Sequence, residues 1–387
     1  MLNIGSVHCA EYEIEASRIS AVVAAEAPGR VHLLGEHGEP HAGLYLSAAI
    51  DKRMQVSVSS RKDSSLRFYA PDLGERKRTT LVNLKFKRED RWANYIKVAI
   101  QVFGDLGYPV KGLNFTVAGN VPQQIGLASS TAVEIAAATA LRGFFHCNIS
   151  EIDLINRLTE VHAAYFGKIP VVADYLVCFY ARNDQLLLID ETTLEVRKIK
   201  FPFTRYKFFI LDSRVPRLGV EDELKQRWHD IKRGRDLLSH RRKEASLREF
   251  APTDLLESTG NLPEVIRRRS MHVVQEIRRV YDAEEALMRS DVQSFSKLIF
   301  HSHESLRDLY EVSCPETDWL VKRAQESEGT LGSRMTGLGF GGCVYAMIHS
   351  NAVEDYKRRL EDYERIFGFR PVMYEVKIST GKRLIPS

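Results

Sequence analysis

Three consecutive segments in the first half of the chain most constrain its fold. Residues 113–117 (LNFTV) alternate apolar and polar side chains, which predicts a β-strand. The polar segment 119–130 (GNVPQQIGLASS) contains two glycines, and the alanine-rich residues 131–145 predict a helix. The free N–H groups and the positive dipole end of a helix that begins after such a loop attract phosphate. This order therefore predicts a phosphate-binding loop in a fold that contains both sheet and helix.

Apolar periodicity on both sides of this loop predicts further elements. The expected strands are residues 22–25, 31–34, 54–59, 185–189, 194–199, 207–211 and 372–378. The expected helices are residues 93–103, 150–166 with Ser150 as the N-cap, 353–367, and several long charged helices between residues 213 and 326. We expect the strands at 185–189 and 194–199 to pair as a β-hairpin.

The chain length predicts two domains. Single hydrophobic cores stop growing at roughly 250 residues, and this chain has 387. The pattern changes near residue 205, beyond which long charged helices follow a strand. We therefore expect an N-terminal domain over residues 1–205, which contains the phosphate loop, and a C-terminal domain over residues 206–387.

Charge and cysteine usage exclude several classes of protein. The 55 Lys and Arg residues are nearly balanced by 51 Asp and Glu, and acidic and apolar residues interrupt the basic run at 227–243. This pattern indicates a solvated helix face and no nucleic-acid partner. No apolar stretch approaches the ~20 residues that a membrane span requires, so we expect no membrane partner. The five cysteines are widely spaced without a C-x-x-C pair, which predicts free thiols and a cytoplasmic location.

The phosphate loop provides candidate ligands for ATP and Mg²⁺. Small residues beside the helix start let a nucleotide approach the backbone. The expected ATP-binding residues here are Gly126, Leu127, Ala128, Ser129 and Ser130. Ser130 can offer its hydroxyl to Mg²⁺, and Glu134, four residues later on the same helix face, can supply a carboxylate. The alternative for Glu134 is an ordinary surface acid of the helix.

Two further segments carry glycine beside polar residues. Residues 337–343 (GLGFGGC) are too glycine-dense for a stable helix and precede a strand. They form either a tight turn or a backbone that packs against phosphate, in which case Gly337 and Gly339 contact ATP. Residues 27–37 (APGRVHLLGEH) place charged residues between apolar neighbours, which indicates either the lining of a site or a solvated loop.

Together these three segments resemble the signatures of the galactokinases, a branch of the GHMP kinase superfamily, in that family's order and spacing. APGRVHLLGEHGEPHAGLYL resembles the N-terminal signature, NVPQQIGLASSTAVEIA the phosphate loop, and RMTGLGFGGC the third motif. Further similar stretches cover most of the chain. The resemblance implies a two-domain α+β fold, with mixed sheets covered by helices and the active site in the cleft between the domains. It also implies transfer of the γ-phosphate of ATP to a monosaccharide hydroxyl, the anomeric one, to give a sugar 1-phosphate.

The resemblance assigns catalytic roles to two residues. Asp174 matches the aspartate that faces the sugar hydroxyl, and its position as a single acid in an apolar run suits a buried functional carboxylate. Its alternative is an acid at a helix end. Arg30 matches the signature arginine, which would keep the Asp174 carboxylate ionised and neutralise charge on the transferred phosphate.

Other matched positions imply contacts with the substrates. The expected substrate-binding residues are Glu36, His37 and Glu39. Trp92 is an expected ATP-binding residue and, like Tyr95, falls in a segment near the adenine in galactokinases. The alternative for both aromatic residues is ordinary core packing.

The sequence departs from the galactokinase pattern beside the sugar. Glu39 stands for an aspartate, and residues 40–42 (PHA) replace tyrosine, asparagine and glycine. Tyr175 replaces a glutamine, Val171 replaces a glycine, and residues 214–223 lack the family's sugar-contacting tyrosine. The acceptor therefore stays open between galactose and a uronic acid, a pentose, an amino sugar or a cyclic polyol. A catalytically silent sugar and ATP sensor is the alternative from another class.

Overall fold

The computed structural model describes residues 3–14, 22–38, 43–217, 219–239, 246–257, 260 and 262–386. Glu39 and residues 40–42, the predicted neighbours of the sugar, lie outside this set. No helix among the described residues is long and apolar enough to cross a membrane.

The first layer is a mixed sheet of eight strands within the described residues, in the order β12-β1-β2-β5-β3-β4, with the β6–β7 hairpin attached to β2. Its strands are β1 (Val23–Leu34), β2 (Leu44–Ser60), β3 (Ser65–Ala70), β4 (Glu75–Thr80), β5 (Leu113–Gly119), β6 (Gln185–Asp190), β7 (Glu195–Lys200) and β12 (Arg383–Ile385). The predicted hairpin is confirmed, because β6 and β7 pair antiparallel.

The segments expected at 22–25 and 31–34 form one strand, β1, and the Pro28–Gly29 pair does not end it. The pairing of β1 with β2 shifts register between Pro28 and Arg30, which lets the strand accommodate a proline. A Cβ at Gly29 would lie 2.9 Å from the Val121 side chain and 3.1 Å from the Leu127 carbonyl oxygen. Glycine is therefore needed here because the phosphate loop packs directly against the strand.

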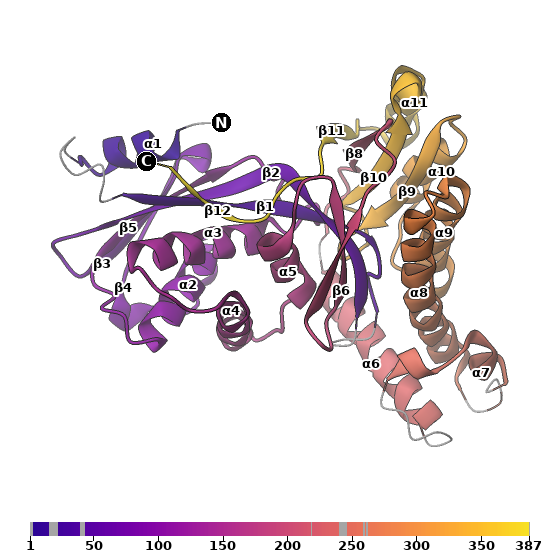
Figure 1. Cartoon of the computed structure of the whole chain (residues 1–387), viewed down its shortest axis with the longest axis horizontal. Helices are drawn as coiled ribbons and strands as arrows, with labels where there is room; N and C mark the ends of the chain where they lie inside the picture. Colours follow the sequence, from indigo (N-terminus) through magenta and orange to yellow (C-terminus); the bar gives the residue numbers. More distant parts are fainter. Residues whose placement is uncertain are drawn as a thin grey trace.

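Helices cover both faces of this sheet (Figure 1). One face carries α2 (Ala93–Asp105), α3 (Ser129–Phe144), α4 (Glu151–Phe166) and α5 (Val172–Tyr180), and the other carries α1 (Ile4–Glu11). The small side chains of α3 let it pack closely on β1 and β2, and its alanines at 132, 136, 137, 138 and 140 are fully buried. Ser150 caps α4 as predicted, since its hydroxyl accepts from the Asp153 amide.

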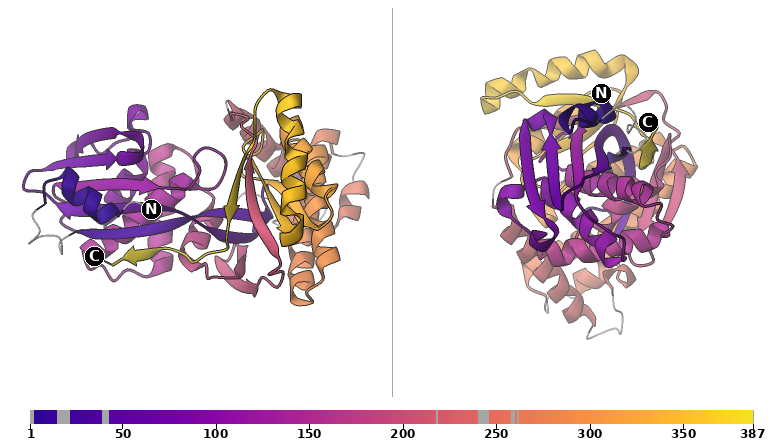
Figure 2. Two further views of the ribbon diagram at one scale, coloured as in Figure 1. Left: turned by 90° about the horizontal axis from the view of Figure 1, so that it is seen from above. Right: turned by 90° about the vertical axis from the view of Figure 1, so that its left-hand side faces the viewer.

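The second layer is a smaller antiparallel sheet in the order β11-β8-β10-β9, with helices on its outer side (Figure 2). Its strands are β8 (Tyr206–Asp212), β9 (Thr330–Thr336), β10 (Cys343–His349) and β11 (Val372–Val376). The helices are α6 (Val220–Ser239), α7 (Pro252–Glu257), α8 (Glu264–Met288), α9 (Val292–Ser305), α10 (Pro315–Gln325), α11 (Val353–Leu360) and α12 (Asp362–Phe367). The helix expected over 353–367 is thus interrupted at Glu361. The α+β class and the helix-covered mixed sheets are as predicted.

The chain passes from the first sheet to the second between β7 and β8, and then returns. This passage lies beside the expected boundary at 205, but β12 pairs with β1 and so places the last residues on the first sheet (Figure 1). Arg53 on β2 holds the returning segment, since it donates to the carbonyls of Thr380 and Gly381 at 2.6 and 3.1 Å. The division into domains over 1–205 and 206–387 stays a prediction. The residues of β12 would then belong to the C-terminal domain in sequence but pair with the sheet of the N-terminal one.

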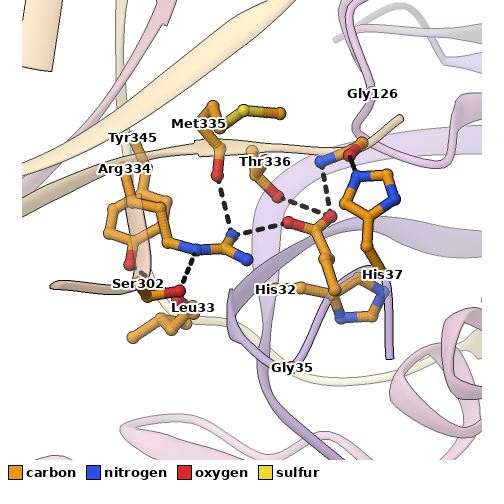
Figure 3. A network of polar contacts seen from close by, with 12 residues as sticks. His32, Leu33, Gly35, His37, Gly126, Ser302, Arg334, Met335, Thr336 and Tyr345 are labelled. Carbon is orange, nitrogen blue, oxygen red and sulfur yellow. Dashed lines mark hydrogen bonds and ion pairs between the residues drawn. The ribbon is translucent and has the colours of Figure 1, made fainter. Parts of the chain in front are cut away.

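A buried arginine joins the two layers. Arg334 on β9 is fully buried, and its Nη1 lies 2.7 Å from a carboxylate oxygen of Glu36, in the loop after β1. Its Nε donates to Ser302 at 2.8 Å and its Nη1 donates to the Met335 carbonyl at 2.7 Å (Figure 3). Its Nη2 lies 3.5 Å from Glu276 on α8. One guanidinium thus neutralises two buried carboxylates from different layers, and its loss would leave both without that charge.

We predict that Arg334→Leu lowers the free energy of unfolding by about 3–5 kcal/mol, the range for breaking a buried ion pair on one side. Chemical denaturation followed by circular dichroism measures it. The control is Arg365→Ala, which removes a solvent-exposed pair with Asp362 and is expected to change stability by less than about 0.5 kcal/mol. Equal stability of the two variants would contradict the structural role of Arg334.

Candidate active site

The predicted catalytic carboxylate lies at the centre of a buried ion pair. Asp174 sits in the first turn of α5, and its Oδ1 is 2.5 Å from Arg30 Nε and 2.9 Å from His32 Nε2. Its Oδ2 accepts from Arg30 Nη2 at 3.2 Å. Burial raises the pKa of Asp174, but the charge of Arg30 and the bonds from Arg30 and His32 outweigh it and lower the pKa to about 2. Asp174 is therefore ionised at neutral pH.

Arg30 connects this carboxylate to the phosphate loop. Its Nη1 donates to the Gly126 carbonyl at 2.5 Å, and its backbone amide donates to the Leu127 carbonyl at 3.1 Å. Burial disfavours the charged guanidinium, yet the adjacent Asp174 raises the pKa of Arg30 above its ordinary value. Arg30, Asp174, Gly126 and Leu127, which the sequence places in three separate segments, thus come together as one unit.

His32 is a member of this site that the sequence analysis missed. Its Nδ1 lies 2.7 Å from the Ser47 hydroxyl, and the ring is 1% exposed. Burial and the charge of Arg30 lower the pKa of His32, so the ring is neutral, accepts from Ser47 and donates to Asp174. The spacing of Arg30 and His32 could have predicted this, because residues two apart on a strand place their side chains on the same face of the sheet.

The start of α3 opens onto a cavity of about 540 Å³. Ser129, Ser130, Trp92 and Tyr95 line it, so these predicted ATP-binding positions lie together. Trp92 is held by its Nε1, which donates to Glu75 at 2.9 Å. Ala128, the residue before the helix, has a positive φ of 56°, which turns the chain into α3. The first amides of a helix have no partner within the helix, and at α3 they belong to residues beside this cavity.

Glu134 does not share a free face with Ser130. It is fully buried, its Oε2 lies 2.8 Å from His162 Nδ1, and its Oε1 accepts from the Tyr175 hydroxyl at 2.7 Å. Burial raises its pKa despite both bonds. Direct ligation of Mg²⁺ by Glu134 would require both bonds to break, so this arrangement argues against the predicted pairing of Ser130 with Glu134 as joint ligands.

The remaining residues fit Mg²⁺ through Ser130. The described part of the chain has no group of three His, Cys, Asp or Glu residues that could hold a metal. Mg²⁺ with ATP does not require one, because it keeps several waters and binds through one or two protein oxygens and the phosphates. The Ser130 hydroxyl, in the first turn of α3 and at the cavity, is such an oxygen.

Glu36 and His37, the predicted sugar contacts, instead bond to the third motif. Glu36 accepts from the backbone amide of Gly337 and from the Thr336 hydroxyl at 3.1 Å. His37 Nε2 lies 3.1 Å from the Gly337 carbonyl oxygen (Figure 3). Burial lowers the pKa of His37 to about 4, so its ring is neutral. These bonds leave Glu36 little free capacity for a sugar hydroxyl.

The two glycines of the third motif have different surroundings. A Cβ at Gly337 would lie 2.9 Å from Gly126 Cα, so the third motif touches the phosphate loop there. A Cβ at Gly339 would lie 2.4 Å from the Val312 carbonyl oxygen, and Gly339 has a φ of +86°. Gly337 therefore lies at the predicted nucleotide site, whereas Gly339 packs against the residues that follow α9.

Three family models match the chain. They are described as GHMP kinases N terminal domain over residues 94–182, GHMP kinases C terminal over residues 283–365, and galactokinase galactose-binding signature over residues 11–60. A putative galactokinase of Treponema pallidum is 36% identical over 100% of this chain and 97% of its own length. The galactokinase of Thermotoga maritima is 32% identical over 93% and 99%, respectively.

The chain belongs to the galactokinase family of GHMP kinases. It is therefore an ATP-dependent sugar kinase, a phosphotransferase with an alcohol group as acceptor. The crystal structure of Lactococcus lactis galactokinase complexed with galactose superposes on this sugar kinase with a TM-score of 0.88 at 26% identity, covering 97% of this chain and 99% of that one. Methanococcus jannaschii mevalonate kinase shares the fold, with a TM-score of 0.63 at 19% identity over 92% and 98%.

We predict that Asp174→Asn lowers the turnover of the sugar kinase by at least ~10²-fold, the effect of losing a positioned acid-base group. ATP affinity should change far less, because we expect the phosphates to bind at the start of α3. Turnover is measured from the rate of ADP release, and ATP affinity is measured by calorimetric titration. A near-normal rate would place the catalytic carboxylate elsewhere.

Arg30→Ala combined with Asp174→Asn should cost less than the sum of the two single losses in turnover. The two side chains bond to each other, so each single change already disrupts the unit. A double-mutant cycle on kcat measures the coupling, with circular dichroism as the check that each variant is folded. Additive losses would show that Arg30 and Asp174 act independently.

Proposed function

We propose that the sugar kinase transfers the γ-phosphate of ATP to the anomeric hydroxyl of galactose and forms a sugar 1-phosphate. The observation that carries this proposal is the direct connection from Asp174 through Arg30 to the phosphate loop at Gly126. In this proposal the carboxylate of Asp174 faces the acceptor hydroxyl, and the adjacent Arg30 faces the transferred phosphate. The full-length similarity to galactokinases, and to one bound to galactose, supports the choice of acceptor.

In the proposed reaction Asp174 orients the acceptor. Both oxygens of its carboxylate already accept from Arg30, and the remaining lone pairs can accept from the sugar hydroxyl. The hydroxyl oxygen forms a bond to the γ-phosphorus as the bond from that phosphorus to the bridging oxygen of ADP breaks. A carboxylate with a pKa of about 2 is a weak base at neutral pH. It therefore receives the proton late, when the attacking oxygen has become positively charged.

In this proposal Arg30 and the N-terminus of α3 stabilise the negative charge on the transferred phosphate. Phosphoryl transfer depends mostly on positioning and electrostatics, and a buried cation held beside the attacked phosphorus supplies both. Bound Mg²⁺ would neutralise charge on the phosphate oxygens, with the Ser130 hydroxyl as its protein ligand. Glu134 is then not a metal ligand, and its bonds to His162 and Tyr175 hold α3 in place.

The nucleotide base is proposed to occupy the cavity beside Trp92. Ser129 and Ser130 line one part of this cavity, and the aromatic residues Trp92, Tyr95 and Phe166 also line it. Aromatic faces suit a purine, and the serines lie where the phosphates would reach the helix start. Tyr95 and Phe166 stack with centroids 5.0 Å apart, which gives that wall a fixed shape.

A panel of acceptors with Mg-ATP, read by ADP release, tests the proposed function. Galactose should give the highest kcat/KM, followed by other hexoses, with pentoses, an amino sugar, a uronic acid and a cyclic polyol in the same panel. Turnover of one of the latter alone would replace galactose as the acceptor. Tight binding of both ATP and a sugar without turnover would favour the silent sensor.

Ser130→Ala should weaken productive Mg-ATP binding and lower turnover while leaving the fold intact, since one small residue replaces another at the start of α3. The measurement is kcat as a function of Mg²⁺ concentration at fixed ATP, with the concentration for half-maximal activity expected to rise. Thr131→Ser at the neighbouring buried position is the matched control and should leave the magnesium profile unchanged. An identical profile in Ser130→Ala would remove Ser130 from the metal site.

A further inference from the structure

Arg217, in the segment that follows β8, lies where the phosphate loop meets the third motif. Its Nη2 donates to the carbonyl of Ile125 at 2.7 Å and to that of Thr336 at 3.5 Å. Ile125 belongs to the phosphate loop of the first layer, and Thr336 is the last residue of β9 in the second layer. The guanidinium of Arg217 therefore bridges the two layers at the phosphate loop.

Glycines make the room that this guanidinium occupies. A Cβ at Gly342 would lie 1.8 Å from Arg217 Nη2, and a Cβ at Gly126 would lie 2.6 Å from Nη2 and 3.0 Å from Nη1. A Cβ at Gly337 would lie 3.2 Å from Nη2. The carbonyl of Gly126 also accepts from Arg30. Two guanidinium groups thus adjoin one residue of the phosphate loop, one from each layer.

The hydrogen bonds of Arg217 leave most of its donors unused. Both of its acceptors are backbone carbonyls, and both bonds come from Nη2. Its Nε is buried without a partner, and its Nη1 makes no hydrogen bond to a residue that the structure describes. Nη1 is one of the two nitrogens that lie beside Gly126. The side chain therefore has free N–H groups next to the phosphate loop.

The charge of Arg217 has no carboxylate partner within the described part of the chain. The acidic groups whose fields reach it are Glu36, Asp212 and Cys343. Glu36 and Asp212 already pair with other arginines of the second layer, at 2.7 and 3.6 Å. Burial raises the pKa of the Cys343 thiol to about 12, so this group is neutral. An arginine stays protonated in proteins, and the charge of Arg217 is therefore uncompensated.

We propose that Arg217 binds the γ-phosphate of ATP, as a second cation beside Arg30. The inference rests on the proposed transfer of this phosphate at the start of α3. Asp174 neutralises Arg30, so that pair brings no net charge to the phosphate, whereas Arg217 brings a full positive charge. A guanidinium with free N–H groups binds phosphate oxygens through charge-assisted hydrogen bonds.

The position of Arg217 selects the γ-phosphate among the phosphates of ATP. Arg30 is proposed to face the transferred phosphate, and both guanidinium groups adjoin Gly126. Transfer of the γ-phosphate to the sugar removes the anionic partner of Arg217 and leaves its charge uncompensated again. Arg217 should therefore favour the binding of ATP over that of ADP.

The test is calorimetric titration of ATP and of ADP, each with Mg²⁺, into the wild-type chain and into Arg217→Gln. The glutamine keeps an amide that can donate to the Ile125 carbonyl and removes the charge. ATP affinity should fall by ~10- to 100-fold, the effect of losing one charge-assisted hydrogen bond, whereas ADP affinity should stay close to that of the wild type. Circular dichroism checks that the variant is folded.

Arg205→Gln, just before β8, removes the same charge from an exposed position and should bind both nucleotides as the wild type does. An unchanged ATP affinity in Arg217→Gln, or an equal loss for ATP and ADP, would overturn the inference. A matching loss of galactose affinity would also overturn it, because Arg217 would then only hold the two layers together.

Hydrogen exchange of the wild-type chain decides the question if Arg217→Gln does not fold. The amides of residues 213–217 should exchange more slowly with a non-hydrolysable ATP analogue than with ADP, and equal protection would overturn the inference. If the chain binds ATP but phosphorylates no sugar, the proposed transfer fails separately, and the comparison of ATP with ADP still decides the role of Arg217. A chain that binds neither nucleotide would overturn both.

Discussion

The buried ion pair between Arg30 and Asp174 is the interaction on which the arrangement of the first layer depends. Two charges removed from water are stable only where geometry and additional hydrogen bonds compensate for the lost hydration. Here β1 supplies Arg30 and His32, α5 supplies Asp174, and the loop before α3 supplies the Gly126 carbonyl. A shift of any of these elements would leave a charge unpaired, so the pair fixes their relative positions as well as the chemistry.

The N-terminal signature segment serves both layers of the molecule. Arg30 points to the phosphate loop, while Glu36, six residues later and beyond the end of β1, bonds to Arg334 and to the third motif on the second sheet. The bonds from Glu36 to the second layer therefore begin in the same segment as Arg30. Because Gly337 also packs against Gly126, the phosphate loop and the third motif share one contact region.

The sequence predicted the local structure well because local structure depends on nearby residues. Alternation in 113–117, the alanines of α3 and the Ser150 cap are all readable over a few positions. The partners of Glu134, by contrast, are His162 and Tyr175, 28 and 41 residues away, and nothing in the spacing of Glu134 from Ser130 reveals that they occupy its carboxylate. The return of β12 to β1 joins residues more than 350 positions apart, and it depends on Arg53 binding the carbonyls of the tail. The partner of Glu36 was likewise not predictable from nearby residues, because its bond to Gly337 spans 301 positions.

The phosphate loop and the surroundings of Asp174 are built from different kinds of group, which explains why the sequence indicated the loop more clearly. The proposed phosphate region is the start of α3 and the loop before it, which Arg30 holds through the Gly126 and Leu127 carbonyls. Backbone groups need glycine or small residues at fixed spacing, and such a pattern is legible in a sequence. The carboxylate of Asp174 is instead surrounded by side chains, namely Arg30 and His32 from β1, with the Tyr45 ring of β2 next to His32. Tyr175, which follows Asp174, bonds to Glu134 on α3, so a substitution at this position would also reach the helix that begins at the phosphate loop.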